Sequence, residues 1–309
     1  MHIINTLLPI FLIVSLGSLL KWKKVFPEDF FKGLGKLVFY VGLPLLLFDK
    51  ISTSVLKINE TWKIFVVILI ALIIIILIAG LIARILKVPK KAVGTFVQAA
   101  FRGNFAFVGL PVIFYAFGAN GDKMSKIAVL AMAPLIPLTT FASLLILISF
   151  GDDKSKISFK DIFIRILKNP LFLITLFALP FSIFQIQIPP FILRSTKTLG
   201  QTALPLALLS IGASLSIAKI KGNVLLASVA AALNIFLLPL IGYCLAVTFS
   251  MNQNELLITM IFLACPAATS SYVMVQQIGG DEHLAGNVVI ISTLMSAVSL
   301  FIVMVLFST

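Results

Sequence analysis

The sequence predicts an all-α protein that crosses a membrane about ten times. Of the 309 residues, 60% are hydrophobic and 11% are charged, whereas about a quarter of the residues in an average soluble domain are charged. The apolar residues gather in ten stretches, most of them near the roughly 20 residues that a helix needs to cross a bilayer. Two of these stretches are interrupted near their middles by Asn, Gly, Pro and Ser.

The ten expected spans are separated by short polar or basic segments. Their ranges are 3–20, 33–49, 63–86, 92–118, 126–150, 170–187, 198–218, 223–249, 255–278 and 284–307. At about 20 residues each they use about two-thirds of the chain, so we expect no separate soluble domain. The first span lacks a basic start and a small-residue cleavage site, and we interpret it as a retained helix rather than a signal peptide.

The basic residues between the spans predict the orientation. The net charge is +13, from 24 Lys and Arg against 11 Asp and Glu, and an even number of spans places both termini on one side. With the termini outside, the cytoplasmic loops at 21–32, 84–91, 154–168 and 219–221 carry 15 Lys and Arg, and the opposite loops at 50–63, 123–126 and 194–197 carry 7. Basic loops stay in the cytoplasm. We therefore expect a multi-pass protein of the cell (inner) membrane with both termini extracytoplasmic, and we interpret the charge as orientation rather than nucleic-acid binding.

A polar central segment divides the chain into two sets of five spans. We expect a first repeat at 1–150, a cytoplasmic connecting loop at 151–169 and a second repeat at 170–309. Because five is odd, the second set runs through the membrane inverted relative to the first. The segments 117–130 and 278–291 each place a Gly-Asp turn after the interrupted span. Inverted repeats with interrupted helices are typical of secondary transporters.

The interruption in the fourth span, RGNFAFVGLPV, begins with Arg102. Arg102 lies eleven residues beyond Lys91, about 16 Å along a helix, which places it near the middle of the membrane. An Arg at that depth normally faces a cavity or a partner, and the alternative is a side chain that folds back onto helix carbonyls or snorkels to the cytoplasm. No acidic residue is expected at its depth, which favours an anionic substrate.

The same interruption contains Asn104, Gly109 and Pro111. Gly109 and Pro111 are expected to break the helix and to free backbone groups. The side-chain amide of Asn104 has two N–H donors and a carbonyl acceptor. It could bind substrate or form hydrogen bonds with the freed backbone groups, and the two roles are compatible.

The interruption in the ninth span, CPAATSS, repeats this arrangement with Pro266 followed by hydroxyl side chains. One alternative is a single Pro kink whose Ser side chains bond back to the helix. Irregular backbone at membrane depth is tolerated only where protein buries it or water lines it, and its occurrence in two corresponding spans favours a transport pathway. The candidate substrate-binding residues are Arg102, Asn104, Gly109, Pro111, Cys265, Pro266, Thr269, Ser270 and Ser271.

Other polar residues in the spans have structural interpretations. Asn234, Asn287, Ser292 and Thr293 are expected to form hydrogen bonds between helices. Asp49 and Lys50, at the end of the second span, are expected to mark the membrane interface.

Several functional classes have no support in the sequence. Cys244 and Cys265 lie in apolar stretches, and His2 and His283 are far apart, so neither a disulfide nor a metal site is expected. The chain has no phosphate-binding GxxxxGK[ST] motif. The spans contain no nucleophile beside a base and no paired carboxylates. We expect neither an enzyme nor a bound cofactor.

The segments RGNFAFVGLPV, CPAATSSYVMVQQIGGD and NVVIISTLMSAVSLFIVMVLF resemble the auxin efflux carrier family, which includes bacterial malate and malonate permeases and the plant auxin carriers. The resemblance covers essentially the whole chain. It implies a fold of ten helices in two inverted repeats, similar to sodium/proton antiporters and bile acid symporters, with broken helices four and nine crossing at the midplane. It also implies a scaffold of helices 1, 2, 6 and 7 that can form a homodimer, and a mobile unit of the other six.

The resemblance also implies roles for particular residues. The Asn that matches Asn104 binds the substrate carboxylate in the plant carriers. Those carriers have a longer central loop and an Arg in span eight, where this chain has Asn234. Together with Arg102, these differences favour the malate and malonate permease branch over auxin itself.

The leading functional hypothesis is secondary transport of a small organic carboxylate anion across the bilayer by alternating access. Each negative charge that leaves an interior-negative cell gains about 2.3 kcal/mol per 100 mV, so efflux needs no coupling ion, whereas uptake would need Na+ or H+. The alternative hypothesis is a ligand-sensing membrane protein that has the transporter fold without turnover.

Overall fold

The computed structural model describes residues 2–54, 58–150, 159–215 and 222–307. Within these ranges all the regular elements are helices. Residues 151–158 of the expected connecting loop lie outside the described residues, and its remainder, 159–169, contains helix α9 (Phe159–Leu167) instead of an irregular loop.

Helices occupy the ten expected span ranges, as far as these are described. They are α1 (His2–Trp22), α2 (Glu28–Leu37) with α3 (Leu43–Ser52), α4 (Ile58–Ile85), α5 (Lys90–Phe101) with α6 (Leu110–Ala116), α7 (Gly121–Met132) with α8 (Leu135–Phe150), α10 (Pro170–Ile183), α11 (Pro190–Ser214), α12 (Val224–Ala232) with α13 (Leu238–Thr248), α14 (Gln253–Leu263) with α15 (Thr269–Ile278), and α16 (Glu282–Phe307).

Five continuous helical segments of the described residues are long and apolar enough to cross a membrane: Glu28–Ser52, Thr61–Ile85, Gly121–Phe150, Val224–Thr248 and Glu282–Phe307. Four shorter apolar helices are Thr6–Trp22, Phe105–Ala116, Pro170–Ile183 and Gln253–Leu263. The all-helical, membrane-spanning class is therefore as expected. The arrangement of ten spans in inverted repeats stays a prediction, because interrupted and short helices do not reach spanning length by themselves.

Three π-helical segments occur at the same place relative to a proline. They are η1 (Val38–Gly42), η2 (Phe105–Gly109) and η5 (Leu233–Leu237), and each is followed directly by Leu-Pro. Proline lacks an N–H and its ring collides with the carbonyl of residue i−4 in a regular helix. The wider π turn changes which carbonyl faces the ring, so the helix continues through the proline.

The contacts divide the chain into two compact units, each assembled from separate stretches. Unit 1 consists of 1–62, 106–137 and 165–215, and unit 2 consists of 63–105, 138–164 and 216–309. Unit 1 thus contains the described parts of spans one, two, six and seven, which the resemblance groups together. It also contains the second half of span four and the first part of span five.

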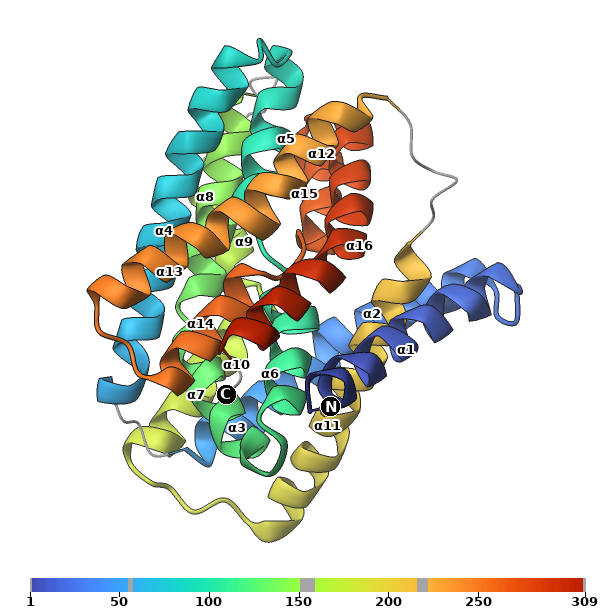
Figure 1. Ribbon diagram of the computed structural model, residues 1–309. Coiled ribbons are helices and arrows are strands. Elements are labelled where there is room, and N and C mark those ends of the chain that lie inside the picture. The colour runs from blue at the N-terminus through green and yellow to red at the C-terminus, as the bar shows by residue number, and fades with distance from the viewer. Residues whose placement is uncertain (1, 55–57, 151–158, 216–221, 308–309) are drawn as a thin grey trace. The chain divides into compact units, whose positions relative to one another are not determined.

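Unit 1 is built around α11, which packs against α1, α2 and α3 (Figure 1). Glycines let the backbones of α1 and α11 approach closely. A Cβ on Gly212 would lie 1.8 Å from the carbonyl oxygen of Val14, and one on Gly17 would lie 2.1 Å from that of Leu209. Small residues at helix crossings are the usual means of close packing in membranes, where no hydrophobic force joins the helices.

Unit 1 also buries charges that the sequence placed at the membrane interface. The Lys50 residue is only 2% exposed, and its ammonium group forms an ion pair with Asp122 and lies 3.9 Å from the carboxylate of Asp49. Asp49 and Lys50 are thus buried within the unit, and their expected position at the membrane interface stays a prediction. Helix α7 packs against α3 and brings Asp122 to the buried lysine.

Unit 2 is built around α16, which packs against α5, α12, α14 and α15. These helices include the first half of span four and both halves of span nine. Figure 1 shows α12 and α16 side by side. One long helix therefore supports both interrupted spans.

We predict that Gly212→Leu destabilises unit 1, because the side chain would overlap the backbone of α1. Overpacking of this kind costs about 1 to 3 kcal/mol or more, which will appear as a lower Tm of the purified protein in detergent. The matched control is Gly33→Ala in α2, where a Cβ meets nothing within 4 Å. Equal Tm values for the two variants would contradict the close approach.

Candidate functional site

The two interrupted spans meet through their non-helical backbone. Gly103, just after α5, forms an isolated antiparallel bridge with Ala267, just before α15. The N–H of Asn104 donates to the carbonyl of Pro266 at 2.8 Å, and the N–H of Ala268 donates to the carbonyl of Arg102 at 2.8 Å. We call this contact, formed by residues 102–104 and 264–268 in unit 2, the crossing.

Every backbone N–H of the crossing has an acceptor. Besides the two hydrogen bonds of the bridge, the N–H groups of Arg102, Gly103, Ala264 and Cys265 donate to carbonyls of the preceding helical turns. Pro266 has no N–H, and the remaining N–H, on Ala267, donates to a side chain of α16. This complete pairing meets the requirement that buried backbone groups be satisfied, which is strict at membrane depth.

Two serines of α16 anchor the crossing from one side. The Oγ of Ser292 accepts from the N–H of Ala267 at 3.0 Å, and the Oγ of Ser299 donates to the carbonyl of Ala264 at 3.0 Å. Cys265 is fully buried and its Sγ donates to the carbonyl of Ile261 at 3.1 Å, so its thiol is engaged with its own helix. The α16 anchors fix the position of the break in span nine.

The break in span four lies before the glycine and proline that the sequence indicated. Helical structure resumes at Phe105 in η2 and continues through Gly109 and Pro111 into α6. The expectation that Gly109 and Pro111 break the helix is therefore wrong, because the π turn of η2 accommodates the proline ring. Both residues are buried and belong to unit 1 rather than to the crossing.

The guanidinium of Arg102 is incompletely paired. Its Nη2 donates to the Oγ of Ser270 at 3.4 Å, while its Nη1 is buried without a hydrogen-bond partner in the described structure. Arg102 also forms no ion pair with any described residue. A buried donor left unsatisfied costs about 1 to 3 kcal/mol, and more when it is charged, so this cation is suited to receive an anion.

Further polar groups around the crossing are without partners in the described part of the chain. Asn104 is 5% exposed, and its side-chain amide makes no hydrogen bond. The Oγ of Ser271 is buried and unpaired. These groups lie beside the guanidinium in sequence or across the bridge, and the helical break leaves them available to a ligand.

Helix α15 begins directly after the crossing with an uncapped end. Its N-cap residue, Ala268, offers no side-chain acceptor, and the N–H groups of Thr269 and Ser270 make no hydrogen bond among the described residues. Free N–H groups and the helix dipole make such an end favourable for an anion. Arg102 reaches Ser270 at this end, so a fixed cation and a helix N-terminus converge on one place.

The structure thus brings together most of the residues indicated by the sequence. Arg102, Asn104, Pro266 and Ser270 meet at the crossing, with Cys265, Thr269 and Ser271 in the same segment. Of the polar residues interpreted as interhelical, Ser292 bonds across helices as expected, and so does Asn234, whose Nδ2 donates to the carbonyl of Ala100 at 3.4 Å. Thr293 bonds instead within its own helix. The uncapped N-terminus of α15 at Thr269 was not predicted from the sequence, in which only the preceding Pro266 indicates that a helix is interrupted here.

Sequence comparisons relate the chain to one protein family and to two curated relatives. A family model described as a membrane transport protein matches residues 2–304. An uncharacterized transporter of Methanocaldococcus jannaschii is 26% identical over 302 residues, which cover 94% of this chain and 94% of the relative. An uncharacterized transporter of Methanothermobacter thermautotrophicus is 25% identical over 300 residues, covering 96% of this chain and 95% of the relative.

We predict that Ser292→Ala weakens the crossing, because the buried N–H of Ala267 loses its acceptor. The expected loss of stability is about 1 to 3 kcal/mol, measured as a lower Tm in detergent. Ser149→Ala in α8 is the matched control, since Ser149 is exposed and bonds only to the carbonyl of Leu145 in its own helix. A Tm for Ser292→Ala no lower than that of the control would show that the anchor contributes little.

Proposed function

Because the chain belongs to the membrane transport protein family, which is the auxin efflux carrier family, we propose that it carries a small organic carboxylate anion across the membrane by alternating access. Malate and malonate are the substrates that the resemblance favours. The observation that carries the proposal is the uncapped start of α15 beside the incompletely paired guanidinium of Arg102.

A carboxylate fits the donors at this place. One oxygen accepts from the guanidinium of Arg102, and the other accepts from the free N–H groups of Thr269 and Ser270, as anions do at helix N-termini. The amide of Asn104 adds a neutral donor that can orient the acid. Charge-assisted hydrogen bonds of this kind are about twice as strong as neutral ones, and a site without a neighbouring carboxylate favours anions over cations.

The division of contacts into two units supports a mechanism with two moving bodies. Unit 2 holds the crossing, and unit 1 holds spans one, two, six and seven. In the proposed cycle unit 2 carries the substrate while unit 1 serves as the scaffold, which could form a homodimer through helices 1, 2, 6 and 7. The crossing is compact and internally paired, so it can move as a body without exposing backbone groups to lipid.

We predict that Arg102→Ala and Asn104→Ala each abolish counterflow of radiolabelled malate or malonate in proteoliposomes. Loss of a hydrogen bond to a charged group costs about 1.5 to 3 kcal/mol, which lowers affinity about 10- to 100-fold. The matched controls are Arg84→Ala and Asn120→Ala, both at exposed positions, which keep wild-type counterflow. Unchanged transport in the two site variants, with folded protein in the membrane, would remove these residues from the site.

We further predict that di- and monocarboxylates raise the Tm of the purified protein in a concentration-dependent manner, because a ligand that binds the folded state stabilises it. The screen is performed with and without sodium, and a sodium-dependent rise would indicate Na+ as the coupling ion. Carboxylate binding without saturable flux in liposomes would favour a sensor over a carrier. Absence of binding by any carboxylate tested would contradict the proposed substrate class.

If the anion moves without a coupling ion, efflux depends on the membrane potential. Each negative charge that leaves an interior-negative compartment gains about 2.3 kcal/mol per 100 mV. We predict that a potassium diffusion potential, negative inside, accelerates malonate efflux from loaded proteoliposomes relative to zero potential. A rate that does not respond to the potential would show that transport is electroneutral and that a cation accompanies the acid.

A further inference from the structure

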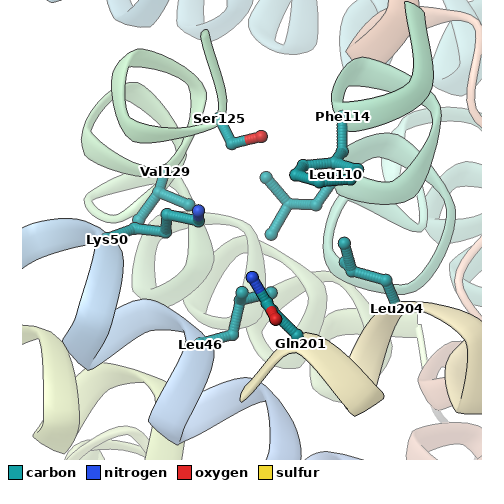
Figure 2. Close-up of a pocket in the computed structure, with 8 residues that line it drawn as sticks. All are labelled: Leu46, Lys50, Leu110, Phe114, Ser125, Val129, Gln201 and Leu204. Atoms are coloured by element: carbon teal, nitrogen blue, oxygen red, sulfur yellow. The ribbon is translucent and has the colours of Figure 1, made fainter. Parts of the chain in front are cut away.

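Unit 1 contains a small cavity with a buried cation at its side. The ammonium group of Lys50 lies 5.9 Å from the ring centroid of Phe114, and apolar walls come from residues such as Leu46 and Leu110. Figure 2 shows the amino group of Lys50 directed into the space between helices α3, α6, α7 and α11. None of the residues of the crossing takes part in this cavity.

Two neutral polar groups complete the lining. The hydroxyl of Ser125 comes from α7 and the amide of Gln201 from α11, and both lie around the central space in Figure 2. Gln201 is exposed and makes no hydrogen bond within the described residues, so its amide is available to a ligand. The cavity thus combines a cation, an amide donor and apolar walls, which is the donor set for a small organic acid.

The counter-ion of Lys50 is placed so that it can be exchanged. Asp122 forms the ion pair, yet its side chain is 51% exposed and has a second cation, Lys126, at 3.8 Å. The ammonium group of Lys126 also donates to the carbonyl of Thr53 at 3.2 Å, which holds this second cation near Asp122. Asp122 can therefore leave Lys50 and remain paired and hydrated.

Lys50, unlike Asp122, cannot exchange its counter-ion for water. It is 2% exposed, and its other carboxylate neighbour, Asp49, lies 3.9 Å away at the limit of an ion pair. A buried charge that loses its partner is strongly destabilising. When Asp122 turns to Lys126, another anion is needed at Lys50.

The size of the cavity limits what this anion can be. The free space beside Lys50 holds about one water molecule. A carboxylate that takes the place of the Asp122 carboxylate needs little additional room, because the two groups are chemically alike. The rest of the acid would occupy the half-exposed space that the Asp122 side chain vacates.

We propose that the Lys50 cavity is a second carboxylate-binding site, at which the carboxylate of a small organic acid replaces Asp122 as the counter-ion of the buried ammonium group. The site consists of residues of unit 1 alone, and the proposal does not depend on the function proposed for the crossing. In the orientation predicted from the loop charges, it lies toward the extracytoplasmic end of spans two and five, where an acid would meet it outside the cell.

The test is thermal unfolding of the full-length protein in detergent, with malonate titrated against chloride at constant ionic strength. All variants carry Arg102→Ala, which weakens binding at the crossing equally in each of them, so that differences between the variants report the Lys50 cavity. With Asp122→Asn the competing carboxylate is gone, and the malonate concentration for a half-maximal rise in Tm falls at least about tenfold, the scale of one interaction with a charged group. The matched control is Asp29→Asn, which removes an exposed ion pair with Lys32 in the same unit and leaves that concentration unchanged.

If Asp122→Asn does not fold, Lys50→Gln provides a second test. Lys50→Gln removes the cation and leaves Asp122 beside Lys126, and it abolishes the malonate-dependent rise that the Arg102→Ala protein shows. The proposal is overturned if Asp122→Asn responds to malonate as Asp29→Asn does, or if the rise persists after Lys50→Gln. Since the crossing carries the same substitution in every variant, neither outcome bears on whether the crossing of the wild-type protein binds substrate.

Discussion

The structure of unit 2 depends on one requirement, that every buried backbone N–H find an acceptor, a requirement that is strictest inside a membrane. Each interrupted span alone would leave N–H and carbonyl groups without partners. The two interruptions solve this together, because Gly103 and Ala267 form an isolated antiparallel bridge flanked by two backbone hydrogen bonds. Ser292 and Ser299 of α16 supply the two remaining partners. The break in span four therefore requires the break in span nine and the packing of α16.

The pairing of every backbone N–H of the crossing is also what leaves the side chains for a ligand. In an ordinary proline kink, neighbouring hydroxyls and amides are used to repair the helix. Here the bridge and the α16 serines perform that repair. Among the described residues, the Oγ of Ser271 and the Nη1 of Arg102 have no hydrogen-bond partner, and the side chain of Asn104 makes no hydrogen bond. The same arrangement leaves the first N–H groups of α15 free beside the cation. The proposed carboxylate site follows from this division of roles between backbone and side chains.

Unit 1 depends on close helix packing and on a buried charge rather than on paired irregular backbone. Its helices approach closely through Gly17 and Gly212, and its unusual feature is a lysine kept inside by an ion pair. Burying an ion pair costs desolvation free energy that the attraction between the charges only partly offsets. The pair formed by Lys50 and Asp122 is therefore expected to add little to the free energy of unfolding. Its geometry, with one partner locked inside and the other half-exposed, is better explained by exchange of the counter-ion.

The sequence by itself determined the class of the fold, the ranges of the apolar helices and the family, because the length and hydrophobicity of a membrane helix are properties of its local sequence. It also indicated Arg102, Asn104 and the segment from Cys265 to Ser271 through polar residues in apolar surroundings. Only the tertiary structure decided that the break in span four lies at residues 102–104 and not at Pro111, since a π turn absorbs the proline and the pairing partner comes from the other half of the chain. It likewise decided that Lys50 is buried, because the position of Asp122 against α3 depends on packing between distant segments, which no local pattern encodes.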